Sequence, residues 1–259
     1  VAQADIDASN GVIHIVDAVI GLPNIVDHAL ANSDLSSLVG ALTSGGNTTF
    51  TTLLSTPGDF TVFAPLNSAF STYTNPTSNE LNSILANHVI VGATALSGGL
   101  VNGYVNTAAT FNGTERNLSM YINTDNSMVT INGKSEVVKA DIIATNGVIH
   151  VVDKVIDLPT VVDFAIADPN FTSLVAALSA ADGDLVNVLS NDGTLTVFAP
   201  TNDAFVALLG AIGQTELDDV TESVLRNILE YHVISTAAIM SSDLSDGDEA
   251  ETVSGENVS

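Results

Sequence analysis

Residues 146–159 read Asn-Gly-Val-Ile-His-Val-Val-Asp-Lys-Val-Ile-Asp-Leu-Pro, and residues 10–23 read Asn-Gly-Val-Ile-His-Ile-Val-Asp-Ala-Val-Ile-Gly-Leu-Pro. The two stretches differ at only three of their 14 positions, so the chain contains an internal repeat. Each copy predicts a short β-branched strand that follows a tight Asn-Gly turn. Because the run at residues 12–16 is β-branched and apolar except at His14, we expect this strand to be buried.

The composition is that of a folded protein of two domains. Hydrophobic residues make up 46% of the 259 residues and charged residues only 14%, which argues against global disorder. The length suits one large domain or two of ordinary size, and the repeat spacing of 136 residues favours two. There is no Trp, so we expect cores built mainly from Val, Ile, Leu and Ala.

The charge balance is strongly acidic, with 30 Asp and Glu residues against 5 Lys and Arg residues and a net charge of −25. Such a chain has little with which to neutralise phosphates, so nucleic acid and anionic membrane surfaces are poor partners, and we predict no nucleic-acid partner. Salt would screen the self-repulsion of this surface, and acid would remove it by protonating carboxylates. The composition is therefore compatible with a saline or acidic habitat.

The chain has no Cys, which excludes disulfides and thiolate chemistry but does not decide the compartment. No stretch reaches the roughly 18 to 20 apolar residues of a membrane span, and the first residues do not resemble a signal peptide. Because residue 1 is Val and not Met, we expect the numbered chain to be a processed or excised piece of something longer.

Residues 24–159 are predicted to form one complete unit. Its expected elements are helices over 24–42 with a break near 32–34, a strand over 60–65, a helix that begins after Asn67 as its cap, a helix over 81–88, and strands and hairpins over 100–138. The last of these regions contains three Asn-Gly pairs, which are typical of hairpin turns.

Residues 160–259 begin a second unit, since residues 196–205 match 61–70 and residues 225–234 match 81–90. This second unit lacks counterparts of the last strands of the first unit. Residues 1–23 match those last strands but have no unit in front of them. By alignment, about 20 residues separate the positions of Ser259 and Val1, which is room for about two strands. We therefore expect the numbered chain to begin and end inside domains rather than at their boundaries.

Three kinds of landmark, in this order, resemble the fasciclin-like family, whose unit is the FAS1 domain. The matching stretches are residues 61–70 and 196–205 for the first signature of the family, and residues 10–17 and 146–153 for the second. Tyr231-His232 resembles the Tyr-His pair between them, from which the first unit departs with Asn87-His88. The resemblance covers essentially the whole chain.

The resemblance implies an α+β fold: an antiparallel β-sandwich or wedge with a packed helical cluster, repeated in tandem. It also implies secreted or surface-anchored proteins that act in adhesion or matrix assembly. No catalytic centre and no cofactor come with the family, and the fold does not fix the partner.

Four histidines within apolar runs are the first candidates for a site: His14, His88, His150 and His232. Positioned imidazoles can bind a metal, but no third ligand recurs at a fixed offset, so we predict no metal site. We interpret the four as structural histidines whose ring nitrogens hold strand and helix together.

Carboxylates give two further candidates. Asp17 and Asp153 end the signature strand, where capping a turn is the favoured role and binding a partner's donor is the alternative. In some members of the family this Asp-containing motif is linked to integrin binding. The acidic loop at residues 243–249 lacks the full spacing of a calcium loop, so we interpret it as solvated charge, with weak cation binding as the alternative.

Five Asn-x-Ser/Thr triplets are candidate glycosylation sites: Asn47, Asn112, Asn117, Asn170 and Asn257. Such triplets are frequent by chance in a chain rich in Thr and Asn. Their use depends on whether the protein crosses a glycosylating compartment.

We predict a non-enzymatic, extracellular protein, secreted or at the cell surface, built of tandem FAS1 modules and serving in adhesion or as a structural polymer. Its expected partners are other copies of itself or adjacent FAS1 domains, head to tail, with a cell-surface protein or glycan as the alternative. A secreted module that binds a small ligand or glycan is the alternative function. A hydrolase is disfavoured, because no Gly-x-Ser-x-Gly elbow is present.

Two hypotheses explain the out-of-phase ends. Residues 1–23 of one chain could complete residues 160–259 of a neighbour by strand complementation, giving an open filament. Alternatively, the window belongs to one covalent chain of many repeats. The sequence favours the covalent array, because a donor of 23 residues cannot replace all the missing strands.

Overall fold

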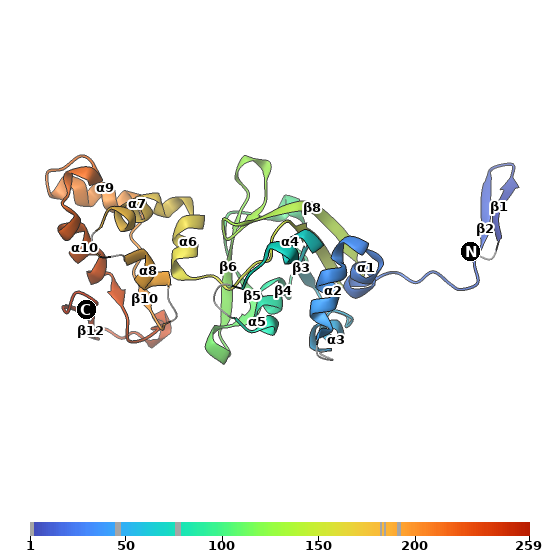
Figure 1. Cartoon of the computed structure of the whole chain (residues 1–259), viewed down its shortest axis with the longest axis horizontal. Coiled ribbons are helices and arrows are strands. Elements are labelled where there is room, and N and C mark those ends of the chain that lie inside the picture. The colour runs from blue at the N-terminus through green and yellow to red at the C-terminus, as the bar shows by residue number, and fades with distance from the viewer. Residues whose placement is uncertain (1–2, 45–47, 76–78, 182, 184, 191–192) are drawn as a thin grey trace.

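The computed structural model describes residues 3–44, 48–75, 79–181, 183, 185–190 and 193–259. An N-terminal hairpin, a central α+β unit and a second, mainly helical unit follow one another along the chain (Figure 1). The hairpin pairs β1 (Gln3–Ala8) with β2 (Gly11–Ile15) and stands apart from the central sheet (Figure 1).

A seven-stranded sheet with the order β4-β3-β9-β8-β7-β6-β5 forms the centre of residues 24–159. Its strands are β3 (Phe60–Pro65), β4 (Val89–Val91), β5 (Gly103–Thr110), β6 (Asn117–Asn123), β7 (Thr130–Ile131), β8 (Ser135–Ala144) and β9 (Gly147–Val152). The predicted α+β fold is confirmed. Within this sheet, the described strands pair antiparallel except for β3 and β9, whose long connection lets β9 return in the direction of β3.

Short helices cover the β3–β9 part of this sheet. They are α1 (Ile25–Ala31), η1 (Ser33–Leu35), α2 (Ser36–Leu42), α3 (Thr49–Leu53), α4 (Asn67–Thr72) and α5 (Leu81–Asn87). Helix α1 begins with a reciprocal capping box between Asn24 and Asp27. The predicted break near residues 32–34 is confirmed, because Asn32 ends α1 and accepts a hydrogen bond from the Asp34 N–H.

Asn67 does not cap the helix that follows β3, and that prediction is wrong. Helix α4 begins at Asn67 itself and has no side-chain cap. The Asn67 side chain instead accepts from Ser37 N at 2.8 Å and donates to Ser33 O at 2.8 Å. These partners lie about 30 residues upstream, where no local pattern could reveal them. Asn202 makes the same kind of bond to Ser173 N in the second unit.

Strand β9 is buried along its whole length, as β3 is, since all six residues of each strand are buried. On one face, Ile149 and Val151 join a core cluster with helix residues that include Leu38 and Phe50. On the other face, Val152 packs in a second apolar cluster. A strand buried on both faces is mainly apolar, which explains the run at 148–152, whose one polar residue, His150, has its ring nitrogens hydrogen-bonded.

The turn that precedes β9 brings three separate segments together. The buried Asn146 side chain accepts from Ile25 N at 3.0 Å and donates to Leu54 O and Thr56 O at 2.7 and 2.9 Å. Gly147 follows with φ +153°, and a Cβ atom there would lie 2.1 Å from the Phe60 carbonyl oxygen. The repeat therefore conserves an amide that satisfies buried backbone groups and a glycine that lets β9 approach β3.

We expect Gly147→Ala to destabilise the central unit by more than about 2 kcal/mol, because the backbone of β3 must move to admit the methyl group. Urea denaturation followed by circular dichroism measures the change. Gly11→Ala is the matched control, since Gly11 holds the same place in the first copy and has open space around it. Equal stability of the two variants would contradict this account of the β3–β9 contact.

Residues 160–259 repeat the helical half of the central unit beside two separate two-stranded sheets. Their elements are α6 (Val161–Ala167), η6 (Pro169–Phe171), α7 (Thr172–Ala180), α8 (Leu185–Ser190), β10 (Thr196–Val197), α9 (Asn202–Ala211), α10 (Glu222–Tyr231), β11 (Val233–Ile234), β12 (Ala250–Glu251) and β13 (Asn257–Val258). Strand β10 pairs with β11 as β3 pairs with β4. Within the described ranges, no strand pairs with the other edge of β10.

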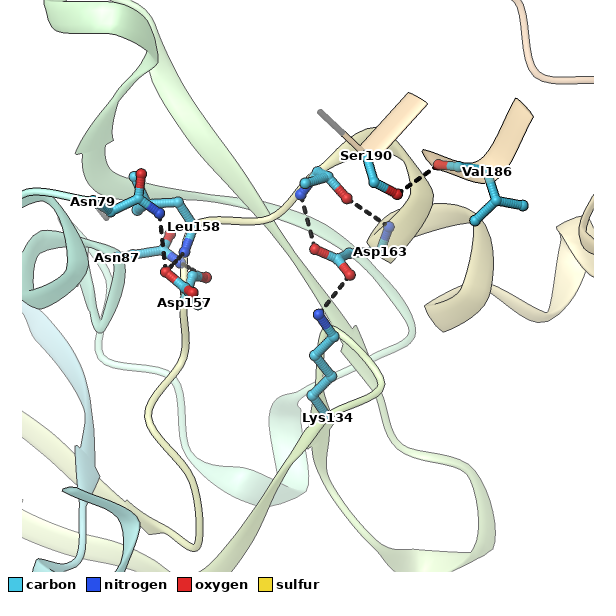
Figure 2. A network of polar contacts seen from close by, with 9 residues as sticks. Asn79, Asn87, Lys134, Asp157, Leu158, Asp163, Val186 and Ser190 are labelled. Carbon is cyan, nitrogen blue, oxygen red and sulfur yellow. Dashed lines mark hydrogen bonds and ion pairs between the residues drawn. The ribbon is translucent and has the colours of Figure 1, made fainter. Parts of the chain in front are cut away.

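Polar contacts fix both ends of the segment between the units (Figure 2). At its start, Asp157 Oδ1 accepts from Asn79 Nδ2 at 3.1 Å, and the Asp157 carbonyl accepts from Asn87 Nδ2 at 2.8 Å. At its end, Asp163 accepts from Thr160 N and forms an ion pair with Lys134 of the central unit. The segment therefore has an anchor in each unit.

Asp168 lies buried at the junction of the two units, where it accepts hydrogen bonds from the Tyr104 and Tyr121 hydroxyls at 3.1 and 3.4 Å. Burial, together with the neighbouring carboxylate, raises the pKa of both tyrosines, so both hydroxyls remain donors. The Asn170 N–H also donates to this carboxylate. Asp168 thus connects the end of α6 to the central sheet.

We expect Asp168→Ala to lower the free energy of unfolding by about 1–3 kcal/mol, because two tyrosine hydroxyls lose their acceptor at a partly buried junction. Thermal unfolding followed by calorimetry measures the loss. Asp246→Ala, at an exposed aspartate of the acidic loop, is the control and should have little effect. A junction that tolerated both changes equally would show that Asp168 does not couple the units.

Candidate functional site

Strand β10 has an open apolar edge where β3 has a neighbour. All six residues of β3 are buried, whereas none of the matching residues 195–200 is. A cavity of about 330 Å³ adjoins this edge, and its lining is almost entirely apolar. The lining includes Val162, Val197, Phe198, Pro200, Leu229 and His232. We name this feature the β10 groove.

The N-terminal hairpin presents a second apolar surface, on β2 and the residues after it. Val12, Ile13 and Ile15 are 53%, 55% and 45% exposed. The prediction that residues 12–16 form a buried strand is therefore wrong for burial, although a strand does form. The physical reason is that no described strand lies beside β2 in the way that β3 lies beside β9.

His14 and His150 have the same local geometry and opposite surroundings. In each, Nδ1 accepts a backbone N–H from the bulge of the preceding strand: Asp5 N to His14 at 3.2 Å and Asp141 N to His150 at 3.4 Å. His150 is completely buried, stacks on Phe63 and pairs its Nε2 with Ala95 O at 2.8 Å. The side chain of His14 is 52% exposed.

His88 and His232 form the second equivalent pair, at the ends of α5 and α10. In each, Nδ1 bonds the carbonyl four residues earlier, Ile84 O at 2.8 Å and Ile228 O at 2.7 Å. Nε2 of His88 accepts from Ile156 N at 2.9 Å. Nε2 of His232 has no hydrogen-bond partner among the described residues, and the ring lines the β10 groove.

Burial lowers the pKa of His88 to about 4, against a smaller opposing effect of its hydrogen bond to Ile84 O. The ring is therefore neutral at physiological pH, with one nitrogen donating and the other accepting. The ring thereby links the end of α5, through Ile84 O, to the backbone that follows β9, through Ile156 N. The structure brings His88 and His150 into one unit but gives them different partners, and they do not meet at a common site.

Asp153 and Asp17 also differ in their surroundings. Asp153 Oδ1 accepts from Glu136 N at 2.7 Å, and its own N–H donates to Glu136 O, so the residue closes the β8–β9 ladder. Asp17 is exposed, in the segment that follows β2. Asp141, across from His150, accepts from both the N–H and the hydroxyl of Ser97, which lowers the pKa of that carboxyl.

The candidate glycosylation sites differ in how their amides are engaged. Asn47 lies outside the described residues. Asn117, Asn170 and Asn257 donate their side-chain N–H groups to Thr107 O, Asp168 and Glu249. Asn112 is exposed at a turn, with φ +47°, and no hydrogen bond of its side chain is recorded.

Carboxylates of the acidic loop at residues 243–249 accept hydrogen bonds from nearby backbone N–H groups. Asp243 accepts from Met240 N at 3.3 Å and Asp248 from Ser245 N at 2.7 Å. Among the residues that the structure describes, no three His, Asp or Glu side chains lie close enough together to hold a metal ion.

Over the same residues, no single helix has the length and apolarity to cross a bilayer. Residues 161–167 and 169–180 pass that test only as a pair bent by 98°.

Sequence reasoning missed a threonine that recurs in both units. Thr61 Oγ1 donates to Ala93 O at 2.8 Å and accepts from Ala95 N at 2.9 Å. Thr196 makes the same two bonds to Ala237 O and Ile239 N, both at 2.8 Å. The signal was present, since both copies of the first signature begin with Thr-Val-Phe-Ala-Pro. The second unit therefore has the same threonine hydrogen bonds on β10 as the central unit has on β3.

Comparisons with known proteins agree with this architecture. The model of the Fasciclin domain family matches residues 33–159 and 169–259. Human periostin is 32% identical over 187 residues, which are 69% of this chain and 21% of periostin. The transforming growth factor-beta-induced protein ig-h3 of Sus scrofa is 30% identical over 236 residues, which are 87% of this chain and 32% of that protein. The chain thus spans a third or less of these relatives.

Among solved structures, a FAS1 domain pair from the insect cell adhesion molecule Fasciclin I matches with a TM-score of 0.54 at 20% identity. The match covers 86% of this chain and 82% of that one. At this level of identity the likeness supports the fold alone.

We expect the stability of the central unit to fall as the pH is lowered from about 6.5 to about 4. His88 is neutral in the folded state and has a pKa near 4, so below pH 6.5 the unfolded chain binds the proton first. The slope from this group is at most about 1.4 kcal/mol per pH unit. Urea midpoints at pH 7.0 and 4.8 measure it. His88→Gln should flatten the difference, and His14→Gln, at an exposed histidine outside the central unit, should not.

Proposed function

The chain belongs to the Fasciclin domain family, and on that basis we propose that it is a non-enzymatic extracellular protein of adhesion or matrix assembly. Its tandem FAS1 modules act by binding other surfaces rather than by turnover. The proposal is supported by the histidines, since the ring nitrogens of His88 and His150 are engaged in hydrogen bonds to the backbone. The insect relative of known structure is described as a cell adhesion molecule.

We further propose that the chain is the subunit of a surface filament or matrix in which neighbours complete one another's modules by strand complementation. The single observation that carries this proposal is the pairing of two exposed apolar surfaces in one chain: the β2 strand and the β10 groove. An open sheet edge is a template for association with another strand. A covalent array of many repeats is the alternative arrangement of the same contacts.

The net charge of −25 opposes contact between copies, whereas the surfaces that would meet are apolar. Salt shortens the Debye length to about 10 Å at 0.1 M and about 3 Å at 1 M, which weakens the repulsion and leaves apolar burial unaffected or stronger. Self-association should therefore increase with NaCl concentration, the opposite of an interface held by ion pairs.

We expect sedimentation velocity of the 259-residue chain to show concentration-dependent oligomers. Their average mass should rise between 0.05 and 1 M NaCl, a range over which the Debye length falls to about 3 Å. Negative-stain electron microscopy of the same samples should show linear assemblies. A monomer under all these conditions would defeat the filament proposal. The adhesion proposal would then be tested separately, by aggregation of beads coated with the chain.

A secreted module for a small apolar ligand is the second candidate, favoured by the apolar character of the β10 groove. A fluorescent hydrophobic probe distinguishes the two. A groove that binds another chain should release the probe as self-association increases, whereas a ligand pocket should hold it at every protein concentration.

In a glycosylating host, we expect Asn112 to be occupied before the other described candidates, because its amide is exposed and makes no recorded side-chain hydrogen bond. Glycopeptide mass spectrometry measures the occupancy, with Asn112→Gln as the control. Occupancy of Asn117 in preference to Asn112 would contradict the expectation.

A further inference from the structure

We propose that Asn112 is a site of spontaneous deamidation, at which the side-chain amide is converted to the carboxylate of aspartate or isoaspartate. The chemistry requires an asparagine whose following residue leaves its backbone nitrogen accessible. Glycine does this best, because it has no side chain and its backbone rotates most freely. The reaction takes place within one chain, so it is independent of the proposed adhesion and assembly.

The reaction balances with water as its only co-reactant. The backbone nitrogen of Gly113 attacks the Cγ atom of Asn112, and the new N–Cγ bond closes a cyclic succinimide. The Cγ–Nδ2 bond breaks, and Nδ2 leaves as ammonia with the proton that the Gly113 nitrogen releases. Water then opens the succinimide at either of its carbonyls, which gives aspartate or isoaspartate. One amide is replaced by one carboxylate, and nothing is oxidised or reduced.

The sequence alone does not select this site, because the chain contains five Asn-Gly pairs. They begin at Asn10, Asn102, Asn112, Asn132 and Asn146. All five lie among the described residues. Two conditions separate them in the fold: the asparagine amide must be free to turn onto the backbone, and the glycine that follows must lie outside a strand, where pairing would hold its backbone.

Burial protects Asn132 and Asn146, which are 4% and 3% exposed. Asn132 Oδ1 accepts from the Tyr121 N–H at 2.8 Å, and Asn146 Oδ1 accepts from the Ile25 N–H at 3.0 Å. Attack on either Cγ atom would first require these buried hydrogen bonds to break, which raises the barrier. Both residues therefore fail the first condition.

Asn102 is exposed, but its amide is engaged at both ends. Oδ1 accepts from the N–H and the hydroxyl of Thr124 at 2.7 and 2.8 Å, and Nδ2 donates to Asp125 Oδ1 at 3.0 Å. Gly103 begins β5, where it pairs with Ile122 of β6. Asn102 therefore fails both conditions.

Asn10 is exposed in the turn of the N-terminal hairpin. Gly11 is the first residue of β2 and pairs with Ala8 of β1. Attack by its nitrogen would require the first pair of the hairpin to open. Asn10 therefore meets the first condition and fails the second.

Asn112 meets both conditions. It is exposed in the short turn at residues 111–113 between β5 and β6, and no hydrogen bond of its side chain is recorded among the described residues. Gly113 lies outside the strands, with φ +70°, and a Cβ atom there would meet nothing within 4 Å. The hydrogen bonds that close the turn run from Phe111 N to Arg116 O and from Thr114 N to Phe111 O. The peptide between Asn112 and Gly113 therefore has open space in which to rotate.

The same Nδ2 atom is the acceptor of the candidate glycosylation triplet Asn112-Gly113-Thr114. A glycan is attached to Nδ2, whereas deamidation expels this atom, so the two modifications exclude each other. A chain without a glycan at Asn112 should therefore lose this acceptor with time. It also gains one negative charge, added to a net charge of −25.

Peptide mapping by mass spectrometry tests the assignment on the complete 259-residue chain, made in a host without N-glycosylation. The folded chain is kept at mildly alkaline pH in water enriched in heavy oxygen, so that each new carboxylate carries the label. Digestion follows in ordinary water. Chymotrypsin cleaves after Tyr104 and Phe111, which separates Asn102 from Asn112. A parallel sample in guanidinium chloride gives the rate of each pair without the fold.

We expect Asn112 to react at nearly the same rate in the folded and the unfolded chain. Asn102, Asn132 and Asn146 should react at least about tenfold more slowly when folded, because one hydrogen bond broken beforehand contributes about that factor. Asn10 should react more slowly than Asn112. Asn112→Gln is the control: its longer side chain closes a ring less readily, so its peptide should stay unlabelled.

Two results would overturn the assignment. One is a folded chain in which Asn112 keeps its amide while the unfolded chain reacts. The other is a folded chain in which any of the other four asparagines reacts as fast as Asn112. Label confined to Asn112 in the folded chain, and spread over all five pairs in the unfolded chain, would establish that the fold selects this site.

Discussion

The close approach of β9 to β3 is the constraint on which the central unit depends. It requires a residue without a side chain at Gly147 and a polar side chain at Asn146 that satisfies the backbone of α1 and of the loop after α3. Once these two conditions are met, the apolar residues of β9 can be buried on both faces. Two buried histidines then fasten the strand and its continuation to neighbouring carbonyls and N–H groups.

The same constraint explains why one sequence motif occurs in two such different settings. In the central unit, the strand has its receiver and its apolar residues are buried. At the N-terminus, the strand and its bulge keep their geometry while the apolar residues face solvent. Local hydrogen bonding therefore determines the hairpin, and the receiver determines only whether burial follows. In the second unit, the helices pack into a core of their own, while no described strand pairs with the outer edge of β10.

The strongly acidic surface and the apolar groove act in opposite directions on association. Repulsion between copies depends on ionic strength, whereas the burial of Ile13 and Phe198 would not. The proposed self-association would therefore increase with salt without any change of conformation. The module junction adds rigidity, because Asp168 and Asp163 both tie α6 to the central sheet.

The sequence by itself determined the repeat, the strand at 60–65 and the histidines worth examining, because each depends on local patterning that two copies display together. The α+β fold was expected from the resemblance to the fasciclin-like family, and the structure confirms it. It did not determine the partner of Asn67, the role of Thr61 or the exposure of residues 12–16. Each of these depends on which segment, tens of residues away, lies alongside. An apolar run indicates that a strand can be buried, but only the tertiary structure decides whether a neighbour is there to bury it.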